Sequence, residues 1–162
     1  MPGEKSSTLL ILVVLAFAVS YFVFIVIIPN MSKGQKPVLG PDQPVGVEHI
    51  QWIIDNLGTS QLRTSSITGK PPEIEMVVTP GDQFFTVTIV NGAAKVRTGL
   101  ADDPDIRMTG SRDVIAELLE TSDLAGTAKR LSTEGRIQLE ILRAMEKIED
   151  MGYKALYLQL TS

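Results

Sequence analysis

The segment covering residues 9–28 constrains this chain most, because its 20 residues (LLILVVLAFAVSYFVFIVII), which start at Leu9 and end at Ile28, include neither a charge nor a proline. A helix of this length spans about 30 Å, the thickness of the hydrocarbon core of a bilayer. A cleaved signal peptide is the alternative, but its apolar region is shorter, at roughly 7 to 15 residues. Residues 28–31 (IPNM) also lack the small residues that signal peptidase needs. The sequence therefore predicts a short N-terminal tail (residues 1–8) and a retained transmembrane helix (residues 9–28).

Charges on the two sides of this helix bear on its orientation. Lys33 and Lys36 follow the helix, whereas Lys5 and its neighbour Glu4 precede it. The positive-inside rule then favours, by one lysine, a cytoplasmic position for everything after the helix. Residues 29–46 (PNMSKGQKPVLGPDQPVG) are rich in proline and glycine and predict an extended linker. The soluble domain is expected to occupy residues 47–162, on the cytoplasmic side of a single-pass membrane protein.

Composition excludes several classes of function. The chain has 162 residues, one histidine (His49), no cysteine and a net charge of −4. Without cysteine there is no disulfide scaffold, thiol nucleophile or cysteine zinc site, and one histidine cannot build a multi-histidine metal site. A nucleic-acid partner needs a concentrated basic surface, which a net negative charge disfavours. We therefore expect a protein that is not an enzyme, with no metal, no cofactor and no nucleic-acid partner.

Periodicity divides the soluble part into helices and strands. Residues 47–57 carry apolar residues at helical spacing, and residues 73–78 change to the alternation of a strand. Residues 84–90 predict a further strand, because they are rich in β-branched and aromatic residues. Asn91-Gly92 is a strong hairpin signal, because both residues tolerate positive φ. Asp102 to Asp105 (DDPD) predicts a solvated turn before a further strand at residues 106–109. This order predicts an antiparallel meander.

Helical spacing returns after the meander. Ser111 is a candidate N-cap for a helix, and Asp123 is a candidate N-cap for a second short helix. Residues 137–141 alternate as a last strand, and residues 144–151 predict a final helix. The apolar tail, residues 155–160 (ALYLQL), fits either a strand or a helical lid.

Four local sequences in this order resemble the sterol carrier protein 2 (SCP2) family. They are the strand and hairpin TVTIVNG (residues 86–92), the strand DPDIRM (103–108), the capped helix at residues 111–120, and the strand GRIQL (135–139). The resemblance covers roughly residues 45–160. It implies an α+β fold with helices over one face of a five-stranded sheet, which we expect to be antiparallel. It further implies a hydrophobic tunnel for fatty acids, acyl-CoA, sterols or phospholipids, with no catalytic constellation.

The predicted tunnel lining consists of apolar residues from the strands and the covering helices. Methionines among them can adapt to an irregular cavity. The expected lining residues are Phe85, Met108, Ile115, Leu118, Leu119, Leu131, Ile137 and Met145.

Charged residues have simpler structural interpretations. Glu73 and Glu75 share one face of their strand, which predicts a solvent-facing row opposite Ile74. Arg107 and Arg112 could meet the headgroup of a ligand near the tunnel mouth, although surface arginines are the commoner case.

The sequence thus predicts a membrane-anchored domain that binds a membrane lipid, a fatty-acyl ligand or another long apolar molecule in a tunnel near the bilayer. The anchor would restrict lipid transport to nearby membranes or partners. An accessory or scaffold subunit of a membrane protein complex is the alternative. Ser20 and Tyr21 favour it, because polar groups within a transmembrane helix can hydrogen-bond to a membrane-protein partner.

Overall fold

The computed structural model describes residues 35–161, with side chains up to residue 158. The predicted tail (residues 1–8), membrane helix (9–28) and first part of the linker (29–34) lie outside these described residues. Within the described range, no helix combines the length and the hydropathy that crossing a bilayer requires. Residues Lys36–Ser162 form one compact unit.

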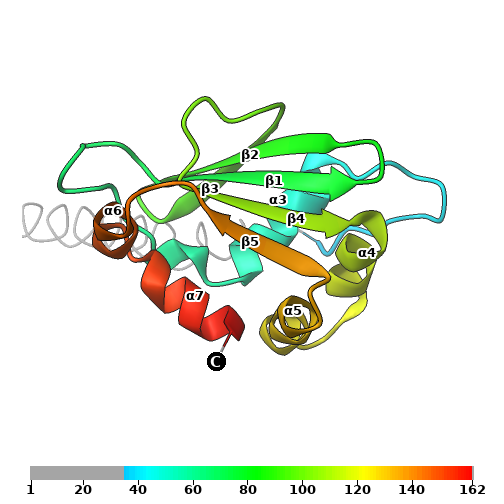
Figure 1. Ribbon diagram of the computed structural model, residues 1–162. Coiled ribbons are helices and arrows are strands. Elements are labelled where there is room, and N and C mark those ends of the chain that lie inside the picture. The colour runs from blue at the N-terminus through cyan, green and yellow to red at the C-terminus, as the bar shows by residue number, and fades with distance from the viewer. Residues whose placement is uncertain (1–34, 162) are drawn as a thin grey trace, which may run out of the picture. The chain divides into compact units, whose positions relative to one another are not determined.

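A five-stranded sheet with the order β3-β2-β1-β4-β5 is the centre of this unit (Figure 1). Its strands are β1 (Glu73–Thr79), β2 (Gln83–Val90), β3 (Ala93–Thr98), β4 (Ile106–Ser111) and β5 (Ile137–Ile141). The pairs β1–β2, β2–β3 and β4–β5 are antiparallel. Asn91 and Gly92 join β2 to β3 with φ values of 53° and 75°, which confirms the predicted hairpin.

The sheet is mixed, so the expected fully antiparallel sheet is wrong at one pair. β1 and β4 run parallel, with Ile74 opposite Ile106. The reason is that residues 99–105 do not turn back beside β3 but cross the sheet and place β4 on the far side of β1. Gly99 starts this crossover at φ 105°, and its N–H donates to the Phe84 carbonyl at 2.8 Å. At the other end, the Asp105 N–H donates to the Glu73 carbonyl at 2.8 Å.

Helices cover one face of the sheet (Figure 1). They are α3 (Val47–Asn56), the 3₁₀ turn η2 (Thr59–Gln61), α4 (Arg112–Glu120), α5 (Leu124–Thr133), α6 (Met145–Asp150) and α7 (Tyr153–Thr161). Both predicted N-caps are confirmed: the Ser111 hydroxyl accepts from the Val114 N–H, and the Asp123 carboxylate accepts from the Gly126 N–H. The apolar tail, which sequence left open between strand and helix, lies in α7.

The core forms where alternate strand residues meet these helices. Ile74 and Val87 on the sheet are fully buried, as are Ile50 and Ile53 on α3. His49 is also buried, and its Nδ1 accepts a hydrogen bond from the Gly46 N–H at 2.8 Å, which fixes the start of α3.

The described part of the linker is bound to the domain. The Arg112 guanidinium donates to the carbonyl oxygens of Gly40 and Gln43. Lys36 donates to the Thr121 carbonyl at 2.9 Å, and its ammonium group lies 5.1 Å from the centre of the Trp52 ring. Residues 36–46 are therefore held against α3 and α4.

Candidate ligand pocket

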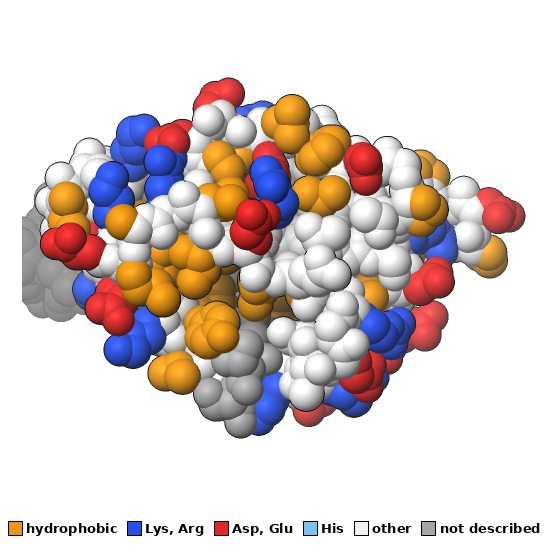
Figure 2. Space-filling view, viewed as in Figure 1, with side chains coloured by type: hydrophobic (Ala, Val, Ile, Leu, Met, Phe, Trp, Pro, Cys, Tyr) orange, Lys and Arg blue, Asp and Glu red, His pale blue; other side chains and the backbone are white. Residues whose placement is uncertain are grey.

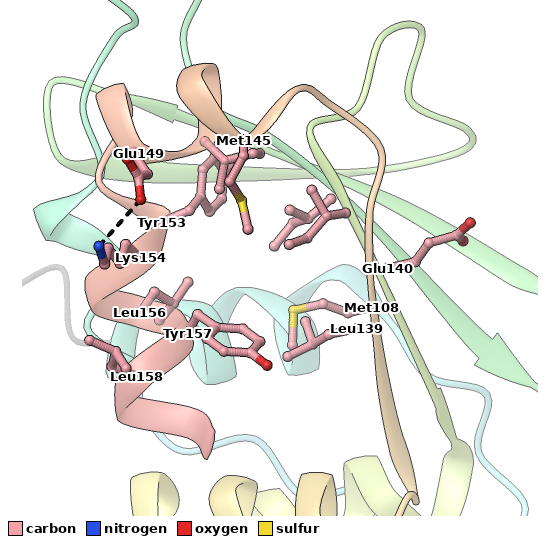
Figure 3. Close-up of a pocket in the computed structure, with 13 residues that line it drawn as sticks. Met108, Leu139, Glu140, Met145, Glu149, Tyr153, Lys154, Leu156, Tyr157 and Leu158 are labelled. Atoms are coloured by element: carbon pink, nitrogen blue, oxygen red, sulfur yellow. Dashed lines mark hydrogen bonds and ion pairs between the residues drawn. The ribbon is translucent and has the colours of Figure 1, made fainter. Parts of the chain in front are cut away.

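A cavity of about 320 Å³ lies between the helical side of β4 and β5 and the two C-terminal helices (Figure 3). The strands supply its apolar residues Ile106, Met108, Leu139 and Ile141. The helices α6 and α7 supply Met145, Ile148, Tyr153, Leu156, Tyr157 and Leu158. Such a volume is near the lower end of the range for small-molecule sites, and its lining is predominantly apolar.

The path of the chain after β5 leaves this space open. Gly152 takes a φ of 88° between α6 and α7, so the chain changes direction there (Figure 1). The helix α7 packs against α5 and α6. Leu139 on the facing strand is only partly buried. The strands and α7 consequently face each other across a cavity.

The mouth of the cavity is also apolar. Ile141, Met145, Tyr157 and Leu158 are 42%, 59%, 50% and 49% exposed, respectively. In the same view as Figure 1, Figure 2 shows hydrophobic side chains gathered over the region of β5, α6 and α7. Exposed apolar residues in one patch beside a cavity are typical of a binding site.

The inner wall contains one buried polar contact. The Tyr153 hydroxyl donates to Asp105 Oδ2 at 3.1 Å, and the same oxygen accepts from the Glu73 N–H at 2.8 Å. Burial raises the pKa of Asp105, while these hydrogen bonds oppose the rise. Burial also raises the pKa of Tyr153, so its hydroxyl keeps its proton. The predicted solvated turn is therefore wrong for Asp105, which anchors Tyr153 in the pocket wall.

Charged groups are confined to the margin of the pocket. Lys154 Nζ lies 3.3 Å from Glu149 Oε1, an exposed pair that Figure 3 marks with a dashed line. Glu140 points away from the cavity in Figure 3 and pairs with Arg107 at 3.1 Å. Lys154 is thus the positively charged side chain that lines the described pocket.

The eight predicted tunnel residues fall into three groups. Met108 and Met145 line the pocket. Ile115, Leu118 and Ile137, again with Met108, line a second cavity of about 20 Å³. Phe85, Leu119 and Leu131 line neither cavity and are packed in the core, at 1%, 3% and 0% exposure. A role in ligand binding stays a prediction for each of the eight.

Sequence reasoning missed most of the α7 side of the pocket. Tyr153, Leu156, Tyr157 and Leu158 were not among the expected lining residues, although all four line the cavity. The apolar tail at residues 155–160 carried the signal, but it could not be oriented while strand and helix both remained open.

On the face of the sheet away from the helices, an ion pair holds the crossover. Glu75 is 2% exposed, and its Oε1 lies 2.6 Å from Arg107 Nε. Its Oε2 accepts from the Ala101 N–H at 3.3 Å. The predicted solvent exposure of Glu75 is therefore wrong, because residues 99–105 cover it. The Glu75 carboxylate also raises the pKa of the Arg107 guanidinium.

Neither arginine that was considered for a ligand headgroup lines the pocket. Arg107 is engaged by Glu75 and Glu140, and Arg112 holds the linker. Lys154, Glu149 and the exposed apolar residues therefore form the margin of the pocket without either arginine.

No family model and no curated protein matches this sequence. Among solved structures, the chain is similar to a ubiquinone synthesis protein, UbiJ-SCP2, at 12% identity and a TM-score of 0.41, covering 68% of this chain and 91% of that one. It is similar to palmitated SCP2L2 from Aedes aegypti at 14% identity and a TM-score of 0.42, covering 71% and 95%. A double mutant of the sec-alkyl sulfatase PisA1 matches at 18% identity and a TM-score of 0.41 over 76% of this chain, which spans only 17% of that protein. The solved structures to which this chain is similar thus include SCP2 domains, at low sequence identity.

Proposed function

We propose that this domain binds a lipid or another long apolar molecule in the pocket between β4, β5, α6 and α7. The observation that carries the proposal is an apolar cavity of about 320 Å³ whose mouth is bordered by exposed apolar side chains. A cavity of this composition excludes most polar ligands, since polar groups buried there would find few partners.

The energy available fits an acyl chain. Burying one methylene group is worth about 0.8 kcal/mol, so about ten methylenes give a gross gain of about 8 kcal/mol. That gain corresponds to a dissociation constant near 1 μM before ordering costs are subtracted. No specific polar contact is needed for such an affinity.

We further infer that the domain works beside a bilayer, on its cytoplasmic side, with residues 9–28 as the anchor. The uncharged apolar segment and the lysines after it support this inference. Because residues 36–46 are bound to the domain, residues 29–35 are the remaining connection. Seven residues can extend at most about 25 Å in any conformation. Exchange of ligand with the anchoring membrane is therefore favoured over distant transport.

We propose binding without catalysis. The single histidine is buried at the start of α3, where its Nδ1 already accepts a hydrogen bond. Of the polar groups that line the described pocket, the Tyr153 hydroxyl is engaged by Asp105 and the Lys154 ammonium group by Glu149.

The test is photochemical labelling of the full chain in proteoliposomes that contain a photoactivatable palmitate. We expect mass spectrometry to find label on peptides from β5, α6 and α7. Leu139→Trp, which obstructs the pocket, should abolish that label, whereas Val90→Trp on an exposed position of β2 should leave it unchanged. Labelling that is confined to residues 9–28, or that is equal in both variants, would refute lipid binding in the pocket.

An accessory role in a membrane protein complex is the second candidate. The specific observation in its favour is the exposed apolar rim, which a protein partner could cover. Extraction in mild detergent distinguishes the two functions. A stoichiometric partner whose crosslinks map to Met145, Tyr157 and Leu158 would favour the complex, and recovery of the chain alone would favour lipid binding.

A further inference from the structure

The pocket and the second cavity share part of their lining. Met108 and Leu139 border both of them. The second cavity lies under α4 and α5, where Ile115, Leu118 and Ala128 contribute to its wall. Two side chains on neighbouring strands therefore separate the open pocket from an apolar space deeper in the domain.

Of these two side chains, Met108 is the one that can move most easily. Methionine is unbranched and has three rotatable bonds, whereas the leucine side chain is branched and stiffer. Met108 is 7% exposed and lies beside Leu139 in Figure 3. The next position of β4 on the same face is Gly110, which lines the second cavity and contributes no side chain to it. A rotated Met108 side chain can thus move into the pocket of about 320 Å³ and uncover the second cavity, which at about 20 Å³ is too small to hold the side chain itself.

We propose that Met108 is a movable plug between the pocket and the second cavity, and that it sets the longest apolar chain the domain accepts. With the plug in the observed position, a ligand ends in the pocket. When the side chain rotates, the two cavities join into one channel that reaches Ile115 and Leu118 under α4. This inference rests on the proposed lipid binding and adds the residue that determines chain length.

Met76 supplies a matched control. It is the register partner of Met108 on β1 and is buried to a similar degree, at 5% exposure. It lines the second cavity but not the pocket. Truncating either methionine removes the same atoms from the core, but only truncation of Met108 removes the wall that the two cavities share.

The experiment labels the full chain in proteoliposomes with photoactivatable fatty acids from laurate to arachidate, each with the reactive group at the end of the chain. In Met108→Ala, the ratio of stearate to laurate labelling should rise about tenfold, the effect of burying about two further methylenes. The label of the longer acids should also move to peptides of α4. Met76→Ala should leave both the ratio and the labelled peptides as in the unmodified chain.

A second variant keeps the inference testable if Met108→Ala does not fold. Gly110→Ala fills the second cavity from β4, where the added Cβ would lie 3.3 Å from Val114 Cγ1, a side-chain atom that can shift slightly. It should lower labelling by the longest acids and leave laurate unaffected. Thermal unfolding of each variant establishes that it is folded.

The outcomes separate the two proposals. If the unmodified chain is labelled in the pocket but Met108→Ala and Met76→Ala behave alike, the plug is refuted and lipid binding stands. If longer acids label α4 equally in all variants, the plug is likewise refuted, because the channel is then already open. If no acid labels the pocket of the unmodified chain, lipid binding fails and the plug fails with it.

Discussion

Two halves of the domain share one sheet but differ in how they are filled. The solid half consists of β1 to β3 under α3, where Ile50, Ile53, Val87 and Phe85 are at most 1% exposed. The second cavity, which Met76 and Ile53 line from this half, is only about 20 Å³. The hollow half consists of β4 and β5 with α6 and α7, where the cavity of about 320 Å³ lies. Apolar residues alternate with polar ones along β2 in the solid half and along β5 in the hollow half. Apolar composition alone therefore does not decide whether a layer becomes core or cavity.

The difference lies in how the helices meet the sheet. In α3 the buried residues Ile50, Ile53 and Ile54 form one stripe, which packs against the sheet. In α7 the apolar residues lie on more than one side of the helix. Tyr153 and Leu156 are buried, whereas Tyr157 and Leu158 are half exposed. A helix with apolar residues around much of its surface can border a cavity and its mouth at the same time.

The largest expected effect contrasts one core truncation in each half. Phe85→Ala in the solid half should lower the free energy of unfolding by about 3 to 5 kcal/mol, since it creates a new cavity. Leu139→Ala in the hollow half should cost only about 1 kcal/mol, because Leu139 borders a space that already exists. Urea unfolding of residues 36–162, followed by circular dichroism, measures both values. Equal losses would show that the two halves are packed alike.

Ligand binding should raise the free energy of unfolding and should slow amide exchange mainly in the hollow half. At a palmitate concentration about a hundredfold above the dissociation constant, the domain should gain about 2.7 kcal/mol of stability. Amide hydrogen exchange should slow in β5, α6 and α7, with little change in α3. Protection that is uniform over the domain, or absent from α7, would contradict the location of the site.

A smaller effect should depend on pH through Asp105 in the wall of the hollow half. Burial raises the pKa of Asp105 above its ordinary value of 3.8. As pH rises above about 4, the unfolded chain ionises first, so the wild type loses stability until pH passes the raised pKa of the folded state.

The variant Asp105→Asn has no ionisable group at this position. Its stability relative to the wild type should therefore increase as pH rises above about 4 and then level off. Unfolding free energies measured across this pH range at constant ionic strength provide the test. A difference that stays flat, or decreases with pH, would show that burial does not control this carboxyl.

The smallest expected effect concerns the attachment of α6. Hydrogen bonds from Ser66 and Ser65 hold the Asp150 carboxylate and lower its pKa. This stabilisation is present above the ordinary pKa of 3.8 and is lost as pH falls through the lowered value. Ser66→Ala should therefore change overall stability little but accelerate amide exchange in α6 at neutral pH. The control is Thr133→Ala, because the Thr133 hydroxyl donates to the Lys129 carbonyl within α5. This variant should leave amide exchange in α6 unchanged.

The strands, caps and hairpin could be predicted because their signals are local. Alternation identified β1, β-branched and aromatic residues identified β2, Asn91-Gly92 identified the hairpin, and Ser111 and Asp123 identified two helix starts. The parallel pairing of β1 with β4 could not be predicted in this way. Residues 102–105 predict a turn, and no local pattern distinguishes a turn from part of a crossover at residues 99–105 that hydrogen bonds to Glu73, Glu75 and Phe84 hold.

The pocket was harder to predict than the fold, because a cavity forms where the side chains of the sheet and the helices do not fill the space between them. Phe85 and Met108 are both apolar residues on the inner face of the sheet. Phe85 meets a filled layer, and Met108 borders two cavities. The distinction depends on the direction that α7 takes after Gly152, which the sequence of the tail does not specify.

The attachment of the linker by Arg112 has a mechanical consequence. A force applied to the N-terminal end of the domain would act first on Lys36, which donates to the Thr121 carbonyl. It would act next on Gly40 and Gln43, whose carbonyl oxygens accept from Arg112. The residues that make these contacts lie in or next to α3 and α4, and none of them belongs to α6 or α7. A pull on Lys36 would therefore load the side of the domain that holds α3 and α4 before it reaches the pocket between α6, α7 and the sheet.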